Sequence, residues 1–286
     1  QVFCEESMSR HTTFRTGGPA DILVTPKAEQ ISEILALCKE KQIPWTVIGN
    51  GSNLLVGDGG IRGVVLEIGK QMSEISIEGT KITAGAGAML SAIASKAAAQ
   101  ELTGLEFAAG IPGTLGGAVR MNAGAYGGEM KQVLESAVVL TQEGELLTIP
   151  VEELGLAYRT SVVEKKDYVV VEATLRLKKG EQAAIREMMD DLKQRRVTKQ
   201  PLEFGSAGST FKRPEGYFAG KLIEDAGLRG FRIGDAQVSE KHCGFVINRG
   251  NATAAQVCEL MQEVVKKVEE TSGVTLEPEV KRIGEF

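Results

Sequence analysis

Apolar side chains recur at the spacing of an amphipathic helix in several segments of the chain. The segments cover residues 29–41, 181–196 and 253–271. In the first of them Ile31, Ile34, Leu35 and Cys38 share one face, and the last is followed by Gly273, a residue typical of helix C-termini. We therefore expect helices that each bury one side. Two more helices are expected at 88–101, from its strong helix formers, and at 217–226, ended by Gly227.

The helix predicted at 181–196 carries its apolar positions among many charges. Ile185, Met188, Met189 and Leu192 lie on one face. The helix ends in Arg195 and Arg196, and Lys199 follows shortly before Pro201. These cations suit a phosphorylated ligand, although basic residues are also common at the C-terminal end of any helix.

Shorter apolar runs bounded by Gly, Pro or charged residues predict strands between the helices. They cover 21–25, 44–48, 63–68, 168–178 and 245–248, with hairpins expected over 75–85 through Gly79 and over 136–149 through Gly144. This mixture, without internal repeats, indicates a nucleotide-type α/β unit, then an α+β unit, then a second α/β unit. The expected parts are 1–70 together with the tail 279–286, then 71–200, then a smaller α/β unit at 201–278.

Composition narrows the function mainly by exclusion. The chain has 286 residues, a net charge of −5 and 42% hydrophobic residues, as expected of a protein with a substantial core. The charge gives no reason to expect nucleic acid or a membrane surface as a partner, and no apolar run approaches the roughly 20 residues that span a bilayer. Two histidines and four cysteines without ligand spacing predict no metal site. Cysteines without a disulfide or metal pattern favour a cytoplasmic protein, and the N-terminal residues carry no signal-peptide pattern.

Glycine clusters at 49–69, 104–128 and 205–234, and the first cluster follows a predicted strand. Gly49 and Gly51 resemble the start of a dinucleotide fingerprint, but Leu54 occupies the place of its third glycine. No Gly-Lys-Ser/Thr follows, which excludes a Walker loop. What remains is a loop at 49–53 whose N–H groups can converge on an anion, or a plain turn.

A second glycine-rich stretch at 110–117, continued at 122–128, strengthens the case for a bound ligand. Its small residues are not those of a core, and Pro112 stiffens the backbone. Two such loops, in different parts of the chain, are able to hold an extended dinucleotide between them.

Six stretches in order then resemble the UDP-N-acetylenolpyruvoylglucosamine reductase family. They are 11–21 (HTTFRTGGPAD), 49–55 (GNGSNLL), 110–113 with 122–126 (GIPG, NAGAY), 157–161 (AYRTS), 207–214 (AGSTFKRP) and 278–284 (PEVKRIG). The resemblance runs nearly end to end. It implies a flavoprotein of the vanillyl-alcohol oxidase type, with FAD between two α+β subdomains and no Rossmann fold, plus a smaller substrate-binding domain.

The implied reaction reduces UDP-N-acetylglucosamine enolpyruvate to UDP-N-acetylmuramate for peptidoglycan synthesis, with FAD bound non-covalently and NADPH as co-substrate. The implied partners are these small molecules, and the sequence indicates no nucleic acid, membrane or obligate protein partner. The resemblance assigns cofactor binding to Ile48, Gly49, Asn50, Gly51, Ser52, Asn53, Leu54, Gly110, Ile111, Pro112, Gly113, Gly116, Gly117, Ala118, Asn122 and Gly124.

The resemblance also assigns three catalytic residues. Arg159 would bind the substrate carboxylate through its planar guanidinium, Ser209 would donate a proton to C2, and Glu279 would stabilise the enolate with Arg159. Each residue type has an ordinary alternative: a surface arginine, a turn or helix-cap serine, and an exposed acid in a Glu-rich tail. A nucleophilic serine is not expected, because the G-x-S-x-G elbow is absent.

Substrate contacts are implied for Tyr126, Tyr158, Lys199 and Arg213. Arg213 stands where some members have asparagine, and the short connection after Ser161 matches a subtype that lacks an extra tyrosine loop. Two other hypotheses stay open at this point. One is an FAD-dependent oxidase of the same fold acting on a small alcohol, and the other is a non-catalytic nucleotide-binding protein.

Overall fold

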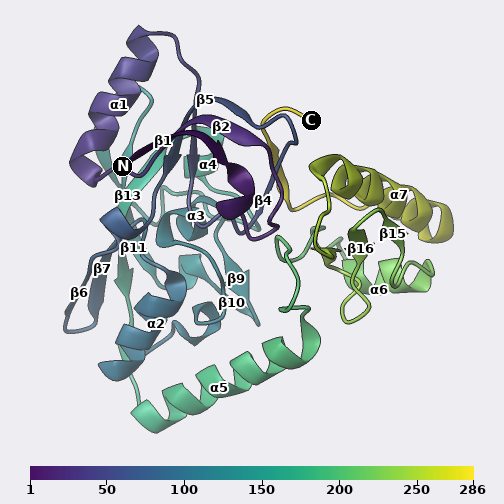
Figure 1. Ribbon diagram of the computed structural model, residues 1–286. Helices are drawn as coiled ribbons and strands as arrows, with labels where there is room; N and C mark the ends of the chain where they lie inside the picture. The colour runs from purple at the N-terminus through teal and green to yellow at the C-terminus, as the bar shows by residue number, and fades with distance from the viewer. The chain divides into compact units, whose positions relative to one another are not determined.

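The computed structural model describes residues 1–286 as two compact units, each built from several segments of the chain (Figure 1). Unit 1 comprises Gln1–Val2, Val24–Asn50 and Val64–Arg196, and unit 2 comprises Phe3–Leu23, Gly51–Gly63 and Val197–Phe286. None of the helices combines the length and the apolar character needed to cross a membrane. The predicted parts 1–70, 71–200 and 201–278 are continuous stretches of sequence, whereas these units are defined by contacts in space. The predicted domain boundaries stay a prediction.

Unit 1 is organised by an antiparallel sheet of five strands in the order β12-β11-β13-β7-β6. The strands are β6 (Ile75–Glu78), β7 (Lys81–Gly85), β11 (Leu134–Leu140), β12 (Leu146–Pro150) and β13 (Val169–Arg176). Ala173 of the central strand pairs with Ala84 on one side and Ala137 on the other, and all three are buried. Both predicted hairpins are confirmed as β6–β7 and β11–β12.

Unit 1 also contains a parallel strand pair next to a helix. β3 (Trp45–Ile48) pairs with the second half of β5 (Ile61–Glu67) in the register Trp45 with Val64. The helix α1 (Ala28–Glu40) buries Ile31, Leu35 and Cys38, which confirms the face that the apolar spacing predicted. β3 ends at Ile48, so it delivers the chain into the first glycine-rich loop.

Two further helices and several short strands complete unit 1. α2 (Leu90–Ala99) and α3 (Leu115–Arg120) lie near the second glycine-rich stretch, and α3 contacts β13. The short elements are β8 (Leu102–Thr103), β9 (Gly124–Ala125), β10 (Gly128–Glu129), α4 (Val162–Lys165) and β14 (Lys178–Lys179). The 3-10 turns in this unit are Lys70–Met72, Glu106–Ala108 and Met130–Gln132.

α3 corrects the expectation that the stretch 110–117 is a loop throughout. Its residues Leu115, Ala118 and Val119 are buried, so the second half of this stretch belongs to the core. The glycines at 116 and 117 obscured the helical spacing, because glycine is a weak helix former.

α5 (Gln182–Lys199) continues past the predicted end at residue 196 and stops two residues before Pro201. Of its expected apolar face only Ile185 is buried, and the Met188 side chain is 54% exposed. Spacing alone therefore overstated the burial of this face. The helix is mostly charged, and a single apolar anchor attaches its first half.

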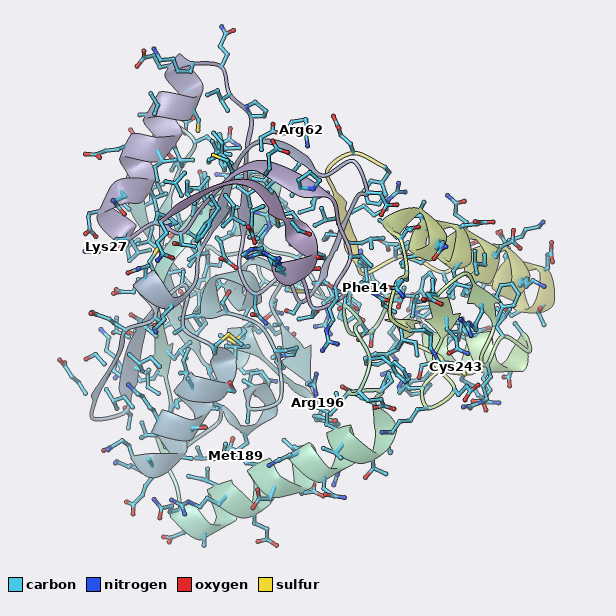
Figure 2. The ribbon with its side chains drawn as sticks, viewed as in Figure 1. Phe14, Lys27, Arg62, Met189, Arg196 and Cys243 are labelled. Carbon is cyan, nitrogen blue, oxygen red and sulfur yellow. The ribbon has the colours of Figure 1, made fainter.

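Unit 2 packs two helices against a small antiparallel sheet (Figure 1). The sheet has the order β15 (Arg232–Ile233), β16 (Ala236–Val238), β17 (Val246–Asn248), and the helices are α6 (Ala219–Asp225) and α7 (Ala254–Ser272). Phe14 is fully buried and joins the same core (Figure 2). Val257, Leu260 and Val264 of α7 are buried as the predicted spacing requires.

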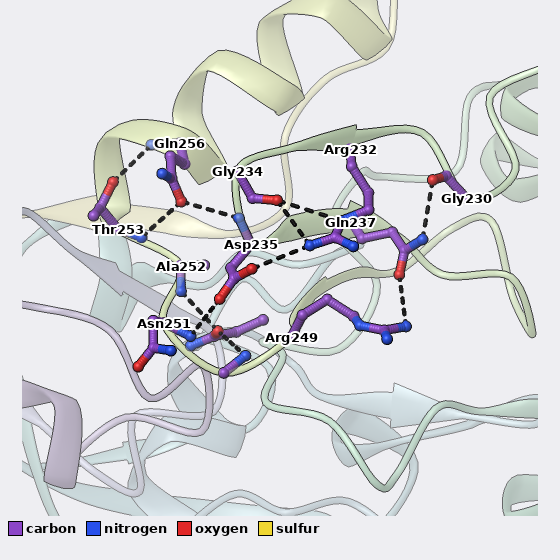
Figure 3. A network of polar contacts seen from close by, with 12 residues as sticks. Gly230, Arg232, Gly234, Asp235, Gln237, Arg249, Asn251, Ala252, Thr253 and Gln256 are labelled. Carbon is purple, nitrogen blue, oxygen red and sulfur yellow. Dashed lines mark hydrogen bonds and ion pairs between the residues drawn. The ribbon is translucent and has the colours of Figure 1, made fainter.

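Polar contacts fix the start of α7 onto the sheet of unit 2 (Figure 3). Thr253 accepts a hydrogen bond from the Gln256 N–H, and Gln256 in turn accepts one from the Asp235 N–H at 3.2 Å. Asp235 also accepts the Asn251 N–H at 3.0 Å and pairs with Arg232 at 3.1 Å. At the other end Gly273 adopts the left-handed conformation, with φ of 71°, that ends a helix.

The tail of the chain returns to pair with an early strand of unit 2. β18 (Lys281–Ile283) runs parallel to β4 (Leu54–Val56), with Lys281 opposite Leu54. In the same unit β1 (Val2–Ser7), β2 (Pro19–Val24) and the first residues of β5 follow one another as neighbours, and Met8–Arg10 form a 3-10 turn. This pairing brings the C-terminal residues beside the end of the first glycine-rich loop.

Candidate active site

The two glycine-rich loops meet within unit 1. The Asn50 side-chain amide donates to the Pro112 carbonyl at 2.6 Å. A Cβ added to Gly49 would lie 2.2 Å from the Thr114 hydroxyl oxygen, so only glycine fits there without a shift. The residue types therefore follow from the contact: glycine allows the close approach, and the amide of Asn50 holds the loops together.

A small cavity of about 70 Å³ opens beside this contact. Its walls are mostly aliphatic, and Gly49, Gly116 and Gly117 leave part of the lining without side chains. The aliphatic lining comes from Val47, Ile48, Ile68, Val163, Val169 and Val170. These glycines let a ligand in the adjoining groove approach the backbone closely. Ile48 is assigned to cofactor binding from the sequence, whereas Val47, Ile68, Val169 and Val170 carry no such signal, because they resemble ordinary core residues.

An open groove of about 890 Å³ shares Gly49, Ile68 and Thr114 with the cavity. Asn50, Lys70 and Lys96 also line it, together with Glu67, so amide groups and charges of both signs stand along the groove. Cavity and groove together give room for an extended polar ligand. This arrangement fits FAD at Ile48, Gly49, Asn50, Gly116 and Gly117.

Arg159 occupies the tip of a tight turn in unit 1. Ala157 and Thr160 exchange both backbone hydrogen bonds, which leaves Tyr158 and Arg159 as a two-residue loop. Arg159 has φ of 55°, a left-handed conformation that side-chain-bearing residues adopt at a cost of roughly 1 kcal/mol or more. Its guanidinium donates to the Gly124 carbonyl at 3.3 Å and lies over the Tyr158 ring. The turn holds this arginine in place, which is unlike an ordinary surface arginine.

Asn122 links the second glycine-rich stretch to that turn. Its side chain is buried and donates to Glu129 at 2.8 Å and to the Ala157 carbonyl at 3.2 Å. Its oxygen accepts the Lys131 N–H at 2.9 Å. The side chain expected to contact cofactor is thus engaged in the scaffold that supports the turn of Arg159. Gly124 contributes its carbonyl to Arg159, whereas Tyr126 is 46% exposed on the same loop.

Unit 2 brings Ser209, Glu279 and Asn53 together from three distant parts of the chain. The Glu279 N–H donates to the Thr210 carbonyl at 2.8 Å, and the Asn53 amide donates to the Glu279 carbonyl at 3.2 Å. The Lys281 N–H completes the link by donating to the Asn53 carbonyl at 2.9 Å. Glu279 is only 7% exposed. It is therefore a buried acid in a defined position, contrary to the alternative of an exposed tail residue.

The backbone around Ser209 is fixed while its hydroxyl stays available. Gly208 has φ of 73°, and Thr210 is held by the Val246 N–H, which donates to its hydroxyl at 2.8 Å. Ser209 itself is exposed and makes no side-chain hydrogen bond within the protein. No helix begins there, so the alternative of a helix cap does not apply.

The remaining predicted substrate contacts lie in unit 2 or at its start. Lys199 is exposed at the end of α5. The Arg213 guanidinium lies over the Phe218 ring at 4.0 Å, and its Nε donates to the Tyr217 carbonyl at 3.2 Å. Gly51 adopts φ of 61° and packs against the backbone of His11. Gly51 and Ser52 lie in the first glycine-rich loop, and Leu54 begins β4 directly after it.

Comparison with known proteins places the chain in a family. A profile of the C-terminal domain of UDP-N-acetylenolpyruvoylglucosamine reductase matches residues 200–283, and a profile described as an FAD binding domain matches residues 19–150. UDP-N-acetylenolpyruvoylglucosamine reductase of Agathobacter rectalis is 58% identical over 294 residues, which cover 99% of this chain and 94% of that protein. The chain belongs to the UDP-N-acetylenolpyruvoylglucosamine reductase family.

Another member of the family, from Clostridioides difficile, is 52% identical over 98% of this chain and 93% of its own length. The crystal structure of the reductase from Thermus caldophilus superposes with a TM-score of 0.84 at 35% identity, covering 99% of this chain and 98% of that one. The resemblance drawn from the six stretches, the α+β class and the FAD-binding fold are thereby confirmed. The assignment of individual site residues stays a prediction.

Proposed function

We propose that this reductase converts UDP-N-acetylglucosamine enolpyruvate to UDP-N-acetylmuramate, with NADPH as electron donor and FAD as a non-covalent cofactor. Family membership over the whole chain supports the reaction. One observation supports the assignment of roles. Glu279 is buried, and its N–H donates to the carbonyl of Thr210, the residue after Ser209, whose hydroxyl is available. Peptidoglycan precursor synthesis in the cytoplasm is part of the proposal.

The cofactor role falls to the two glycine-rich loops. FAD supplies hydride transfer from NADPH to the C3 carbon of the enolpyruvyl group. In this chain the groove beside the aliphatic cavity would hold the cofactor, and Gly49 and Asn50, which line that groove, would supply hydrogen-bond donors to it. Gly51, Ser52 and Asn53, together with Gly110–Gly113, extend these contacts in the proposal.

Arg159 binds and orients the substrate carboxylate. A guanidinium offers two parallel N–H donors that match a carboxylate, and it remains charged throughout the reaction. Anchoring on the Gly124 carbonyl and on the Tyr158 ring limits the rotamers that the side chain can adopt. As negative charge spreads from C2 onto the carboxylate, the fixed positive charge stabilises it most.

Ser209 and Glu279 handle the proton at C2. A serine hydroxyl is a weak acid, so its transfer of a proton depends on a strongly basic enolate and on support from neighbouring groups. The Ser209 hydroxyl has no partner within the protein and is free to turn toward substrate. Glu279 supplies a second polar group for the same enolate. Lys199 and Arg213 are the substrate-binding residues proposed in unit 2, with Lys199 on the diphosphate of the sugar nucleotide, and Tyr126 and Tyr158 are those proposed in unit 1.

An anaerobic stopped-flow experiment tests the proposal in two steps. NADPH should bleach the flavin, and the enolpyruvyl sugar nucleotide should then restore its colour without oxygen. Ser209→Ala should keep the first step and slow the second by about 10²–10⁴-fold. Ser206→Ala in the same loop is the matched control, since its backbone, rather than its hydroxyl, pairs with Thr13. Rapid reoxidation by oxygen with no response to the sugar nucleotide would indicate an oxidase instead.

A further inference from the structure

The three cations at the end of α5 have different surroundings, although the sequence presents them as one basic patch. Arg195 is exposed and pairs with Asp191 at 2.8 Å one turn earlier. Lys199 is exposed beyond it. Arg196 instead packs onto the second glycine-rich loop: a Cβ at Gly110 would lie 3.1 Å from its Cδ and 3.4 Å from its Nη1 (Figure 2 labels the side chain).

Arg196 is partly buried and lacks a counter-ion in the protein. It makes no ion pair and no hydrogen bond, and Tyr126 is the one ionisable side chain that acts on its charge. Burial lowers the pKa of Arg196 from its ordinary value. A guanidinium withdrawn from water without an anion is unfavourable. A bound anion would offset the free energy that this guanidinium loses by leaving water.

The surroundings of Arg196 indicate which anion fits. Gly110 begins the loop that also supplies Pro112, the acceptor of the Asn50 amide. Tyr126 belongs to the strand-turn segment whose Gly124 carbonyl anchors Arg159. Arg196 therefore packs on the second glycine-rich loop and lies near enough to Tyr126 for the two groups to interact electrostatically. Arginine matches phosphate oxygens through its planar fork.

We propose that Arg196 is a phosphate-binding residue of this enzyme, distinct from Lys199. The phosphate belongs either to the diphosphate of FAD or to that of a nucleotide substrate. The identity of the nucleotides rests on the proposed function, whereas the binding of phosphate by Arg196 does not. Arg195 has its own carboxylate partner and takes no part.

Three variants test the proposal on the full chain. Arg196→Met removes the charge but keeps an aliphatic stem over Gly110, and Arg196→Lys keeps the charge but loses the fork. Arg195→Met is the matched control. The readouts are FAD affinity from fluorescence titration of the flavin-depleted protein, and the KM values for NADPH and for the enolpyruvyl sugar nucleotide. A charge-assisted contact of this kind predicts a loss of roughly tenfold or more in Arg196→Met and a smaller loss in Arg196→Lys.

The two sources of phosphate give different results. Weaker FAD binding with unchanged KM values assigns Arg196 to the cofactor, and a raised KM with unchanged FAD binding assigns it to a substrate. In both cases the remaining affinity should depend less steeply on salt. Wild-type values within about twofold for all three ligands in Arg196→Met would overturn the proposal.

Melting of the flavin-depleted variants separates a binding role from a structural one. Removing an unpaired, partly buried charge should leave Arg196→Met at least as stable as the wild type without ligands. A clear drop in melting temperature, restored by Arg196→Lys, would mean that the arginine supports the fold and would also overturn the proposal. Because FAD titration and melting require no turnover, a failure of the proposed reaction would be recognised separately.

Discussion

Gly49→Ala is the sharpest probe of the contact between the two glycine-rich loops. The new methyl carbon would lie 2.2 Å from the Thr114 hydroxyl oxygen, whereas the Thr114 Cβ stands at 3.4 Å. Nothing else is closer than 3.6 Å, so the clash involves one atom. Overpacking of this kind costs about 1–3 kcal/mol. We expect the melting temperature of the flavin-depleted protein to fall by about 2–4 °C for each kcal/mol lost.

The double variant Gly49→Ala/Thr114→Ala isolates the clash. Thr114→Ala removes the hydroxyl and leaves a carbon at ordinary contact distance, so it should recover much of the stability that Gly49→Ala loses. Gly117→Ala is the control for inserting a methyl group elsewhere in the site. Only the Thr114 hydroxyl lies within 4 Å of its Cβ, at 3.8 Å, and Gly117 is in α3.

Gly117→Ala should therefore stabilise the flavin-depleted protein slightly, by up to about 1 kcal/mol, through helix propensity. Because Gly117 lines the cavity, the same methyl group should weaken FAD binding. Thermal melting and flavin titration measure the two effects independently. Equal stability of Gly49→Ala and wild type, or no recovery in the double variant, would refute the contact between the loops. Unchanged FAD affinity in Gly117→Ala would refute the role of the cavity.

Three further predictions concern the scaffold. Asn122→Ala removes the hydrogen bonds that support the Arg159 turn. It should lower the free energy of unfolding by about 1–3 kcal/mol and raise the KM for the sugar nucleotide. An unchanged melting temperature and KM would contradict this. The Asp58 carboxylate accepts the first two N–H groups of α7 at 2.8 and 2.9 Å, so Asp58→Ala should lower the free energy of unfolding in denaturant titrations by about 0.5–2 kcal/mol. The control Asp225→Asn breaks only an exposed ion pair and should cost less than about 0.5 kcal/mol. Equal costs would argue against the helix cap. Burial lowers the pKa of His242 from 6.5, so the folded state favours the neutral ring. The contribution of the neutral ring to folding stability is fully present above pH 6.5 and is lost as the pH falls below that value. Between about pH 7.5 and 5 the melting temperature should therefore decline more in the wild type than in His242→Gln. Parallel declines would contradict the assignment.

The sequence predicted best those features that depend on local pattern. α1 and α7 bury the faces that their apolar spacing indicated, and Gly273 ends α7 in the left-handed conformation. The glycine-rich loops were recognised as one site because glycine is required wherever two backbones approach closely. Gly51 shows that requirement directly, because a Cβ added there would lie 2.1 Å from the His11 carbonyl oxygen.

Features that depend on distant contacts escaped the pattern. α3 was hidden because its two glycines suggest a loop, and its burial against β13 becomes evident only in the folded chain. Arg195 and Arg196 are adjacent and chemically identical in the sequence. One pairs with Asp191 at the surface and the other packs against Gly110, a difference set by the direction in which each side chain leaves the helix.

The loop at 49–53 joins the contact between the two glycine-rich stretches to the buried Glu279 through its own length. Its first residues are fixed in unit 1, where the Asn50 amide reaches Pro112. Its last residue is fixed in unit 2, where Asn53 donates to the carbonyl of Glu279 and accepts the Lys281 N–H. The parallel pairing of β18 with β4 sets this register, so a slip of one residue would move Glu279 relative to Asn53. The missing third glycine at Leu54 follows from the same arrangement, because Leu54 begins a strand that pairs with the C-terminal tail, whereas a dinucleotide fingerprint would place the first turn of a helix there.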